Sequence, residues 1–148
     1  IEGGKVPETR VETLIASAEA VVQAIEAGHV RAAHDLAEGG LLTAAAEMAF
    51  AGNMGATLDV QAVHSDVNTA LYSESNTRWL LEVKADQVEA FEALIAKQTQ
   101  APLVRLGTVT EEATLHVKAG SETLVSQPVQ ALRDVWAHAL PKLLGVEA

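Results

Sequence analysis

The stretch VRAAHDLAEGGLLTAAAEMAFAG, residues 30–52, decides how this chain is built. It opens with a short apolar run, which the polar, glycine-bearing segment DLAEGG then interrupts. Apolar residues return from Leu41 onward at three- and four-residue spacing, which is typical of one face of a helix. The order predicts a strand that ends at His34, a tight turn at Gly39 and Gly40, and a helix after it.

Further helices and strands are predicted on both sides of this stretch. Apolar residues recur at helical spacing from Pro7 to Ala27, and Gly28 is the expected C-cap of that helix. Asp86 is expected to N-cap another long helix, which ends before Pro102. The remaining predicted elements are strands at residues 56–60, 79–83, 104–109, 114–117 and 122–125, a helical turn at residues 65–70, and a closing helix at residues 129–143.

The order of these elements predicts an α+β fold. Helices alternate with single strands over the first two thirds of the chain, and strands cluster in the last third. A mixed sheet with helices packed on its faces accommodates both patterns. The last three strands are separated by the turn signals EEA and AGS, so they are expected to form an antiparallel meander.

Length and local composition suggest the domain organisation. A chain of 148 residues fits one domain with one hydrophobic core. The opening segment IEGGKV carries a glycine pair and precedes a proline, which is typical of a linker between domains. We therefore expect residues 1–6 to be a linker and residues 7–148 to be a single domain cut from a larger chain.

Charge and cysteine content exclude several classes of function. The chain has 10 Lys and Arg against 20 Asp and Glu, a net charge of -10, which speaks against binding to nucleic acid. It has no cysteine, so disulfide frameworks, thiolate metal sites and cysteine nucleophiles are excluded, and a cytoplasmic location is favoured. No apolar stretch approaches the roughly 20 residues that a membrane span needs.

The turn after the first strand holds the best candidate site. Gly39 and Gly40 allow a ligand to approach the backbone closely, and the amides of the next helical turn attract phosphate. Asp35 and Glu38 would repel a bare phosphate, so a phosphate site here requires a divalent cation such as Mg2+ between the carboxylate and phosphate oxygens. The alternative is structural, with one carboxylate capping the helix and the glycines serving only the turn.

Two other features offer chemistry, and each has a plain structural alternative. His34 is a candidate general base or metal ligand, but a histidine at the end of an apolar strand is more often a hydrogen-bonded structural residue. The run SESNTR, residues 73–78, has hydroxyls, a carboxylate and a guanidinium that suit a phosphate or an amide, and it is equally an ordinary polar turn. The sequence contains no Walker loop and no dinucleotide-binding fingerprint.

Two segments carry a resemblance to a known family. The run AHDLAEGGLLTAAAEMAFAGNMGATLDV, residues 33–60, resembles the carboxyl-terminal domain of phosphoribosylformylglycinamidine synthase, and LYSESNTRWLLEV, residues 71–83, continues the match. The second segment is more similar to the small, multi-subunit type of that synthase (subunit II) than to the long single-chain type. The resemblance implies a sandwich like the carboxyl-terminal domain of aminoimidazole ribonucleotide synthetase, the enzyme after which the superfamily is named.

The resemblance also implies a place in de novo purine biosynthesis. Such a synthase is a carbon–nitrogen ligase that converts the amide of formylglycinamide ribonucleotide into an amidine, using ATP and ammonia derived from glutamine. The implied partners are the amino-terminal domains of the same synthase, a separate glutaminase subunit and a small accessory subunit. The isolated domain should be catalytically silent, because the nucleotide subdomain and its catalytic histidine are missing from it.

The resemblance assigns roles to three residues. Asp35 matches an aspartate that binds magnesium, and Gly39 and Gly40 match a phosphate-facing loop, so the implied cofactors are ATP and Mg2+. The family motif HD-x-S-[DE]-GG has a serine where this chain has Ala37, which offers no hydroxyl and leaves the backbone amides as phosphate ligands. The site is either catalytic or auxiliary. The alternative functions are a non-catalytic α+β domain that binds a small molecule or a partner protein, and the equivalent domain of another ATP-using member of the superfamily.

Overall fold

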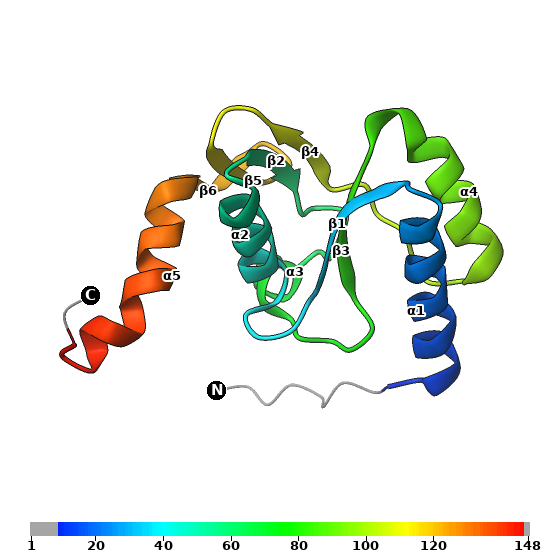
Figure 1. Cartoon of the computed structure of the whole chain (residues 1–148), viewed down its shortest axis with the longest axis horizontal. Coiled ribbons are helices and arrows are strands. Elements are labelled where there is room, and N and C mark those ends of the chain that lie inside the picture. The colour runs from blue at the N-terminus through cyan, green and yellow to red at the C-terminus, as the bar shows by residue number, and fades with distance from the viewer. Residues whose placement is uncertain (1–8, 147–148) are drawn as a thin grey trace. The chain divides into compact units, whose positions relative to one another are not determined.

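The computed structural model describes residues 9–146, and the predicted linker at residues 1–6 lies outside this range. The chain divides into two compact units, which are described separately. Unit 1 comprises the residues up to Ala44 together with Tyr72–Val104, and unit 2 comprises Ala45–Leu71 together with the chain from Arg105 onward. Helix α2, Gly40–Gly52, passes from unit 1 into unit 2 after Ala44, and Figure 1 follows the chain through both units.

Unit 1 contains two long helices and a two-stranded sheet. Its elements are α1 (Val11–Glu26), β1 (Val30–Asp35), β3 (Trp79–Val83), the 3-10 turn η1 (Ala85–Gln87) and α4 (Val88–Gln98). Strands β1 and β3 are antiparallel, and Asp35 at the end of β1 lies opposite Trp79 at the start of β3. Helices α1 and α4 lie side by side in Figure 1. The predicted strands at residues 30–34 and 79–83 are thereby confirmed.

Small residues on α1 allow the close packing that holds unit 1 together. Ala20 and Ala24 are 1% and 0% exposed, and they form a core cluster with the buried Phe91 and Ile95 of α4. Partly buried residues of the two strands and of α4, namely Val30, Leu81, Val83 and Leu94, pack against this cluster. Burying a side chain such as Phe91 contributes on the order of 1.5–3 kcal/mol. The core therefore fixes both strands against the helices, and with them the point where β1 ends.

The ends of the two long helices test two predictions about capping. The C-cap of α1 is Ala27, one residue before the predicted Gly28, and Gly28 follows it with a φ of +76° while its amide donates to the Ile25 carbonyl over 2.9 Å. The predicted N-cap at Asp86 is wrong, because Asp86 lies inside the 3-10 turn that precedes α4. The N-cap position of α4 is Gln87, whose side-chain oxygen is used elsewhere, 3.1 Å from His29 Nδ1.

Unit 2 contains a four-stranded mixed sheet. Its strands are β2 (Gly55–Asp59), β4 (Gly107–Thr110), β5 (Thr114–Ala119) and β6 (Glu122–Pro128), in the order β4-β2-β5-β6. The pair β2–β5 is parallel, and the other two pairs are antiparallel. The buried side chains of Leu58, Leu115 and Val117 form part of the core of this unit. The predicted α+β class with a mixed sheet is confirmed.

The predicted antiparallel meander is wrong. Strands β5 and β6 do form a hairpin, but β2, which lies some fifty residues upstream of β4 in the chain, is inserted between β4 and β5. Strand β4 is also shorter than predicted and begins only at Gly107. A Cβ at Gly107 would lie 1.8 Å from the Thr57 carbonyl oxygen, so the close contact between β4 and β2 requires glycine there.

The remaining helices of unit 2 agree with the prediction. Helix α3, Val67–Tyr72, corresponds to the predicted helical turn and is preceded by Asp66, whose carboxylate accepts from the Thr69 amide over 2.7 Å. Helix α5, Val129–Leu143, is the predicted closing helix. It is anchored by the buried Val129 and by Trp136, whose ring stacks at a tilt against Phe50 with a centroid separation of 5.4 Å.

Candidate functional site

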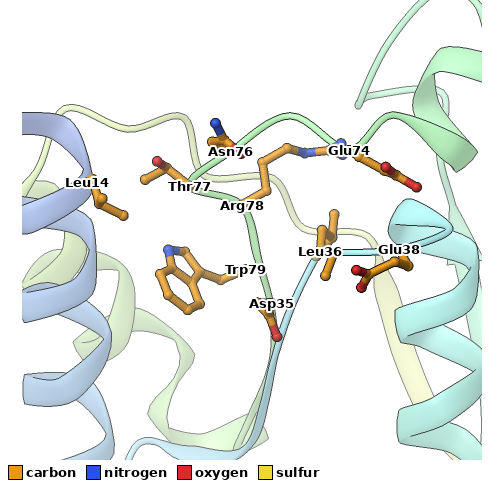
Figure 2. Close-up of a pocket in the computed structure, with 10 residues that line it drawn as sticks. Leu14, Asp35, Leu36, Glu38, Glu74, Asn76, Thr77, Arg78 and Trp79 are labelled. Atoms are coloured by element: carbon orange, nitrogen blue, oxygen red, sulfur yellow. The ribbon is translucent and has the colours of Figure 1, made fainter. Parts of the chain in front are cut away.

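A pocket of about 340 Å³ opens in unit 1 where β1 ends and β3 begins. It is lined by Leu14, Asp35, Leu36, Ala37, Glu38, Glu74, Asn76, Thr77, Arg78 and Trp79. Figure 2 shows Leu14 and Trp79 on one side, Glu38 and Glu74 on the other, and Asp35 and Arg78 between them. The pocket thus has an apolar, aromatic side and an acidic side.

Antiparallel pairing brings the two predicted motifs to this pocket. The end of β1 and the start of β3 are opposite one another, and the Leu36 amide donates to the Arg78 carbonyl over 3.0 Å. The segment DLAEGG, which leaves β1, therefore lies against the segment SESNTR, which enters β3. The sequence singled out both segments, but only the strand pairing shows that they form one site.

The glycine turn has the backbone conformation that the sequence predicts. Gly39 and Gly40 have φ values of +78° and +64°, in the region that favours glycine. The Gly39 amide donates to Glu74 Oε1 over 2.9 Å, and the Gly40 amide donates to the Ala37 carbonyl over 3.1 Å. The amide of Gly39 therefore binds an anionic oxygen, and that oxygen belongs to this chain.

Glycine at position 39 is required by the space beside it as well as by its backbone conformation, because Thr43 lies where a side chain would begin. A Cβ at Gly39 would lie 2.1 Å from Thr43 Oγ1, so the threonine side chain occupies the space beside the turn. Any side chain at position 39 would have to push Thr43 away. The turn is consequently held in one shape from two sides, by Glu74 and by Thr43.

The loop that enters β3 is held by its own hydrogen bonds. Nη1 of Arg78 donates to the carbonyl and to the hydroxyl of Ser73, over 2.9 and 2.6 Å. Burial lowers the pKa of Arg78 from its usual value, yet an arginine remains charged in a protein. Thr77 has a φ of +66°, which is rare for a β-branched residue and marks local backbone strain in the pocket wall. Asn76 Nδ2 donates to Thr9 Oγ1.

Asp35 fits a role as one ligand of a metal ion, and it does not form a complete site. Its side chain is 66% exposed and lines the pocket. Within residues 9–146, no group of three His, Cys, Asp or Glu side chains is close enough to hold a metal. A cation here would therefore take most of its ligands from phosphate and water, as Mg2+ usually does.

The ring of His34 is held by its neighbour Asp35, as expected for a structural histidine. Its Nδ1 hydrogen bonds with the carbonyl of Asp35 over 2.6 Å and lies 3.7 Å from Asp35 Oδ1. The ring is thus oriented by its immediate neighbour at the end of β1. This arrangement agrees with the structural interpretation that the sequence favoured.

Unit 2 holds a carboxylate that the sequence analysis did not single out. Asp59, at the end of β2, accepts from the amides of Gln61 and Gly120, each over 3.1 Å, and its Oδ2 lies 3.7 Å from Lys118 Nζ. The hydrogen bonds from Gln61 and Gly120 lower the pKa of Asp59, and Lys118 lowers it further. Asp59 ties the end of β2 to the β5–β6 turn, so its role is structural.

Two residues of the pocket in unit 1, Leu14 and Trp79, were also missed as site residues. Glu74 and Arg78 appeared only as members of a polar run, and Leu14 and Trp79 only as apolar positions in a helix and a strand. Strand register alone puts Trp79 opposite Asp35. The positive φ of Thr77 has no signal in the sequence, because threonine does not favour that conformation.

The class of protein follows from a family comparison. Residues 2–120 match the model of the family described as AIR synthase related protein, C-terminal domain. The match covers most of the chain, including the pocket of unit 1, and the chain belongs to this family. Among the helices within residues 9–146, none has the length and apolar character that a bilayer crossing requires.

Several solved structures similar to the chain are of one enzyme of Thermotoga maritima. Phosphoribosylformylglycinamidine synthase II is 24% identical over 86% of this chain and 22% of that protein, with a TM-score of 0.76. The structure described as PurL complexed with FGAR is 23% identical over 89% of this chain and 23% of that one, with a TM-score of 0.75. The structure of PurLQS gives 24% identity over 86% and 23%, with a TM-score of 0.74.

These structures share the fold, and they are much longer than this chain. The chain spans under a quarter of the length of each of the three. Complexes of the same Thermotoga maritima protein with ATP, AMPPCP and ADP are also similar, at 24–26% identity.

Proposed function

We propose that residues 7–148 are the carboxyl-terminal domain of a phosphoribosylformylglycinamidine synthase of the small, multi-subunit type. The family match supports this, and so do the similar structures, which are complexes with FGAR, ATP, AMPPCP and ADP. The parent chain would then be a carbon–nitrogen ligase of purine biosynthesis that uses ATP and glutamine-derived ammonia. Its location would be cytoplasmic.

Within that enzyme, the pocket at the end of β1 is the proposed site of a Mg–nucleotide or of a substrate phosphate. The observation that carries this proposal is the 2.9 Å hydrogen bond from the Gly39 amide to the Glu74 carboxylate. A backbone amide that binds a carboxylate oxygen at a helix N-terminus is also placed to bind a phosphate oxygen. Gly39 and Gly40 would face the phosphate, and Asp35 would be a ligand of Mg2+.

Glu74 would compete with the phosphate in this site. A phosphate oxygen can reach the Gly39 amide only if the Glu74 carboxylate gives up its hydrogen bond. With Asp35 and Glu38 lining the same pocket, three carboxylates oppose a bare phosphate and favour one that arrives with Mg2+. The proposal therefore requires that binding depends on the cation and is weakened by Glu74.

Nuclear magnetic resonance of the 15N-labelled chain tests this site even when binding is weak. Titration with ATP and Mg2+ should shift the amide signals of Gly39 and Gly40, whereas ATP with a chelator should not. Glu74→Gln should strengthen the binding by about tenfold or less, because it removes a competing charge and keeps an acceptor for the amide. Asp35→Asn should weaken the binding of ATP that depends on Mg2+.

The matched control is Glu111→Gln, which makes the same charge change in unit 2, on an exposed residue that does not line this pocket. It should leave the titration unchanged. If the Gly39 and Gly40 signals do not move at millimolar Mg–ATP or at millimolar formylglycinamide ribonucleotide with Mg2+, the proposed site is wrong.

The proposed partners are the amino-terminal domains of the same synthase, a glutaminase subunit and a small accessory subunit. Support comes from the similar structure of PurLQS from Thermotoga maritima. No nucleic acid or membrane partner is proposed, in keeping with the net charge of -10.

A second candidate function is a non-catalytic α+β domain in which the glycine turn only begins a helix. The same hydrogen bond favours it, because Glu74 already satisfies the Gly39 amide as a capping carboxylate would. In that case Glu74→Gln changes stability by a few tenths of a kcal/mol and reveals no ligand. The titration described above separates the two candidates.

A further inference from the structure

Helix α1 has two apolar faces, and only one of them is buried in unit 1. Its inner face carries Ser17, Ala20, Val21 and Ala24, all buried. Its outer face carries Val11, Ile15, Val22 and Ile25, which are 59%, 52%, 52% and 47% exposed. Single exposed apolar residues are ordinary, but a continuous row of them along a helix indicates an interaction surface.

The spacing of the outer row is that of a coiled-coil seam. With Ala18 in the middle, the successive positions 11, 15, 18, 22 and 25 are four, three, four and three residues apart. This is the a/d pattern whose side chains fit between those of a second helix. The row extends over about 21 Å of the helix axis at 1.5 Å per residue. Its shape therefore suits a helix rather than a strand or a small ligand.

The charges beside this row are all of one sign. Glu12, Glu19 and Glu26 are spaced seven residues apart, and each follows directly after a seam residue. Helix α1 contains no Lys or Arg, and among residues 9–146 no ion pair involves these three exposed carboxylates. The opposite edge is formed by Leu14 and Val21, which turn toward the interior of unit 1. One edge of the seam is thus a row of unpaired negative charge.

This charge pattern decides what kind of helix fits. A second copy of α1 in antiparallel orientation would place glutamates against glutamates, because e positions then face each other, and a parallel copy would place the glutamates against Leu14 and Val21, which offer them no opposite charge. Each copy of the chain also carries a net charge of -10, which opposes self-association. Lysine or arginine along the edge of the incoming helix removes this repulsion and gives each glutamate a partner.

We propose that the outer face of α1 is a docking surface for an amphipathic helix of a separate protein chain, with an apolar a/d seam and a basic edge. The surface is formed by the row Val11, Ile15, Ala18, Val22 and Ile25 and by the three glutamates beside it. It does not include the glycine turn, and only Leu14 at its edge also lines the pocket of unit 1.

A pair of synthetic helices tests the proposal on the full chain. Both are about three heptads long, with leucine at the seam and a fluorescent label, and they differ in carrying lysine or glutamate at the flanking positions. Fluorescence anisotropy should show binding of the lysine peptide and at least about tenfold weaker binding of the glutamate peptide. The preference should decrease as salt is raised.

Matched variants separate the seam from the general acidity of the chain. The double variant Ile15→Ser, Val22→Ser should bind the lysine peptide about tenfold more weakly, or weaker still. The control double variant on α5, Val135→Ser with Leu143→Ser, should bind it as the wild type does. Replacing Glu12, Glu19 and Glu26 by lysine should reverse the preference between the peptides. Replacing the exposed Glu89, Glu111 and Glu122 by lysine makes the same change in net charge and should not reverse it.

Circular dichroism of each variant confirms that the fold is retained, as expected for substitutions at exposed positions. Three results would overturn the proposal: neither peptide binds, the α5 variant weakens binding as much as the α1 variant, or the control triple reverses the preference. Sedimentation that shows a dimer broken by Ile15→Ser would also overturn it, because the surface would then bind a second copy.

Discussion

At the scale of single residues, Gly39 joins the backbone conformation of the site to its chemistry. Its φ of +78° aims the amide at Glu74 Oε1, and Thr43 fills the space where a side chain would begin. A residue with a Cβ at this position meets both a conformational penalty and a steric one. Gly28 has almost the same φ, +76°, with only Lys84 Nζ near a Cβ, at 4.0 Å.

Gly39→Ala should therefore destabilise the chain more than Gly28→Ala does. The left-handed backbone costs each variant roughly 1–2 kcal/mol, and the contact with Thr43 adds about 1–3 kcal/mol at position 39 alone. Urea unfolding measures both variants. Thr43→Ala should recover part of the added cost in the Gly39→Ala background, because it removes Oγ1 at 2.1 Å and keeps the Cβ at 2.9 Å, and it should not reduce the loss caused by Gly28→Ala. Equal losses for both glycines would show that Thr43 does not matter.

The lowered pKa of Asp59 predicts that the stability of the chain depends on pH. Its pKa in the folded chain is below the ordinary value of 3.8, because the Gln61 and Gly120 amides bind the charged form. The stabilisation is fully present above pH 3.8 and is lost as the pH falls through the lowered pKa. Unfolding of wild type and Asp59→Asn should thus differ most near neutral pH and converge in acid. A difference that stays constant down to pH 2 contradicts this account.

At the scale of elements, strand β2 organises unit 2 because both of its edges are paired. It is antiparallel to β4 on one side and parallel to β5 on the other. Two glycines permit these contacts, since a Cβ at Gly55 would lie 1.9 Å from the Glu112 carbonyl oxygen and one at Gly107 would lie 1.8 Å from that of Thr57. Backbone atoms cannot move aside as the end of a side chain can.

Gly107→Ala should consequently release β4 from the sheet. The Asp59 amide donates to the Leu106 carbonyl over 2.7 Å beside this position, so its hydrogen exchange should become at least about tenfold faster. Gly52→Ala is the matched control, because a Cβ there meets only the Met54 side chain, at 3.8 Å or more. Unchanged protection of the Asp59 amide in Gly107→Ala would mean that β4 tolerates the substitution by shifting.

At the scale of the whole molecule, the chain consists of two compact units, and helix α2 begins in unit 1 and continues into unit 2. The candidate pocket belongs entirely to unit 1, and the mixed sheet belongs to unit 2. The pocket has an acidic side and one amide already bound to Glu74, and it has no metal cluster within the described residues 9–146. Under the proposed function, this pocket contributes only part of a nucleotide site.

The chain alone should therefore not hydrolyse ATP or form the amidine. A coupled assay for ADP with formylglycinamide ribonucleotide, ammonia and Mg2+ measures this directly. The expected rate is that of the buffer, because the proposed site only orients phosphate and cation. Turnover that persists through purification and disappears in Asp35→Ala would contradict the proposal and make this unit an enzyme by itself.

The positions of most helices and strands were determined by the sequence itself. The strand at residues 79–83, the closing helix at residues 129–143 and the end of α1 just before Gly28 follow from apolar spacing and glycine, which are local signals. The family resemblance rests equally on local segments, HDLAEGG and SESNTR. Asp86 was misjudged because a carboxylate suits an N-cap, while the backbone there first makes a 3-10 turn.

Only the tertiary structure decided which segments meet. Whether β4 pairs with β5 or with β2 depends on contacts between residues some fifty positions apart, and no local pattern encodes such a pairing. The same holds for the site: the sequence pointed to Asp35, Gly39 and Gly40, whereas strand register brought Glu74 to the Gly39 amide and Trp79 to Asp35. Residue types determined what the turn can bind, and packing between distant segments determined what it binds in the folded chain.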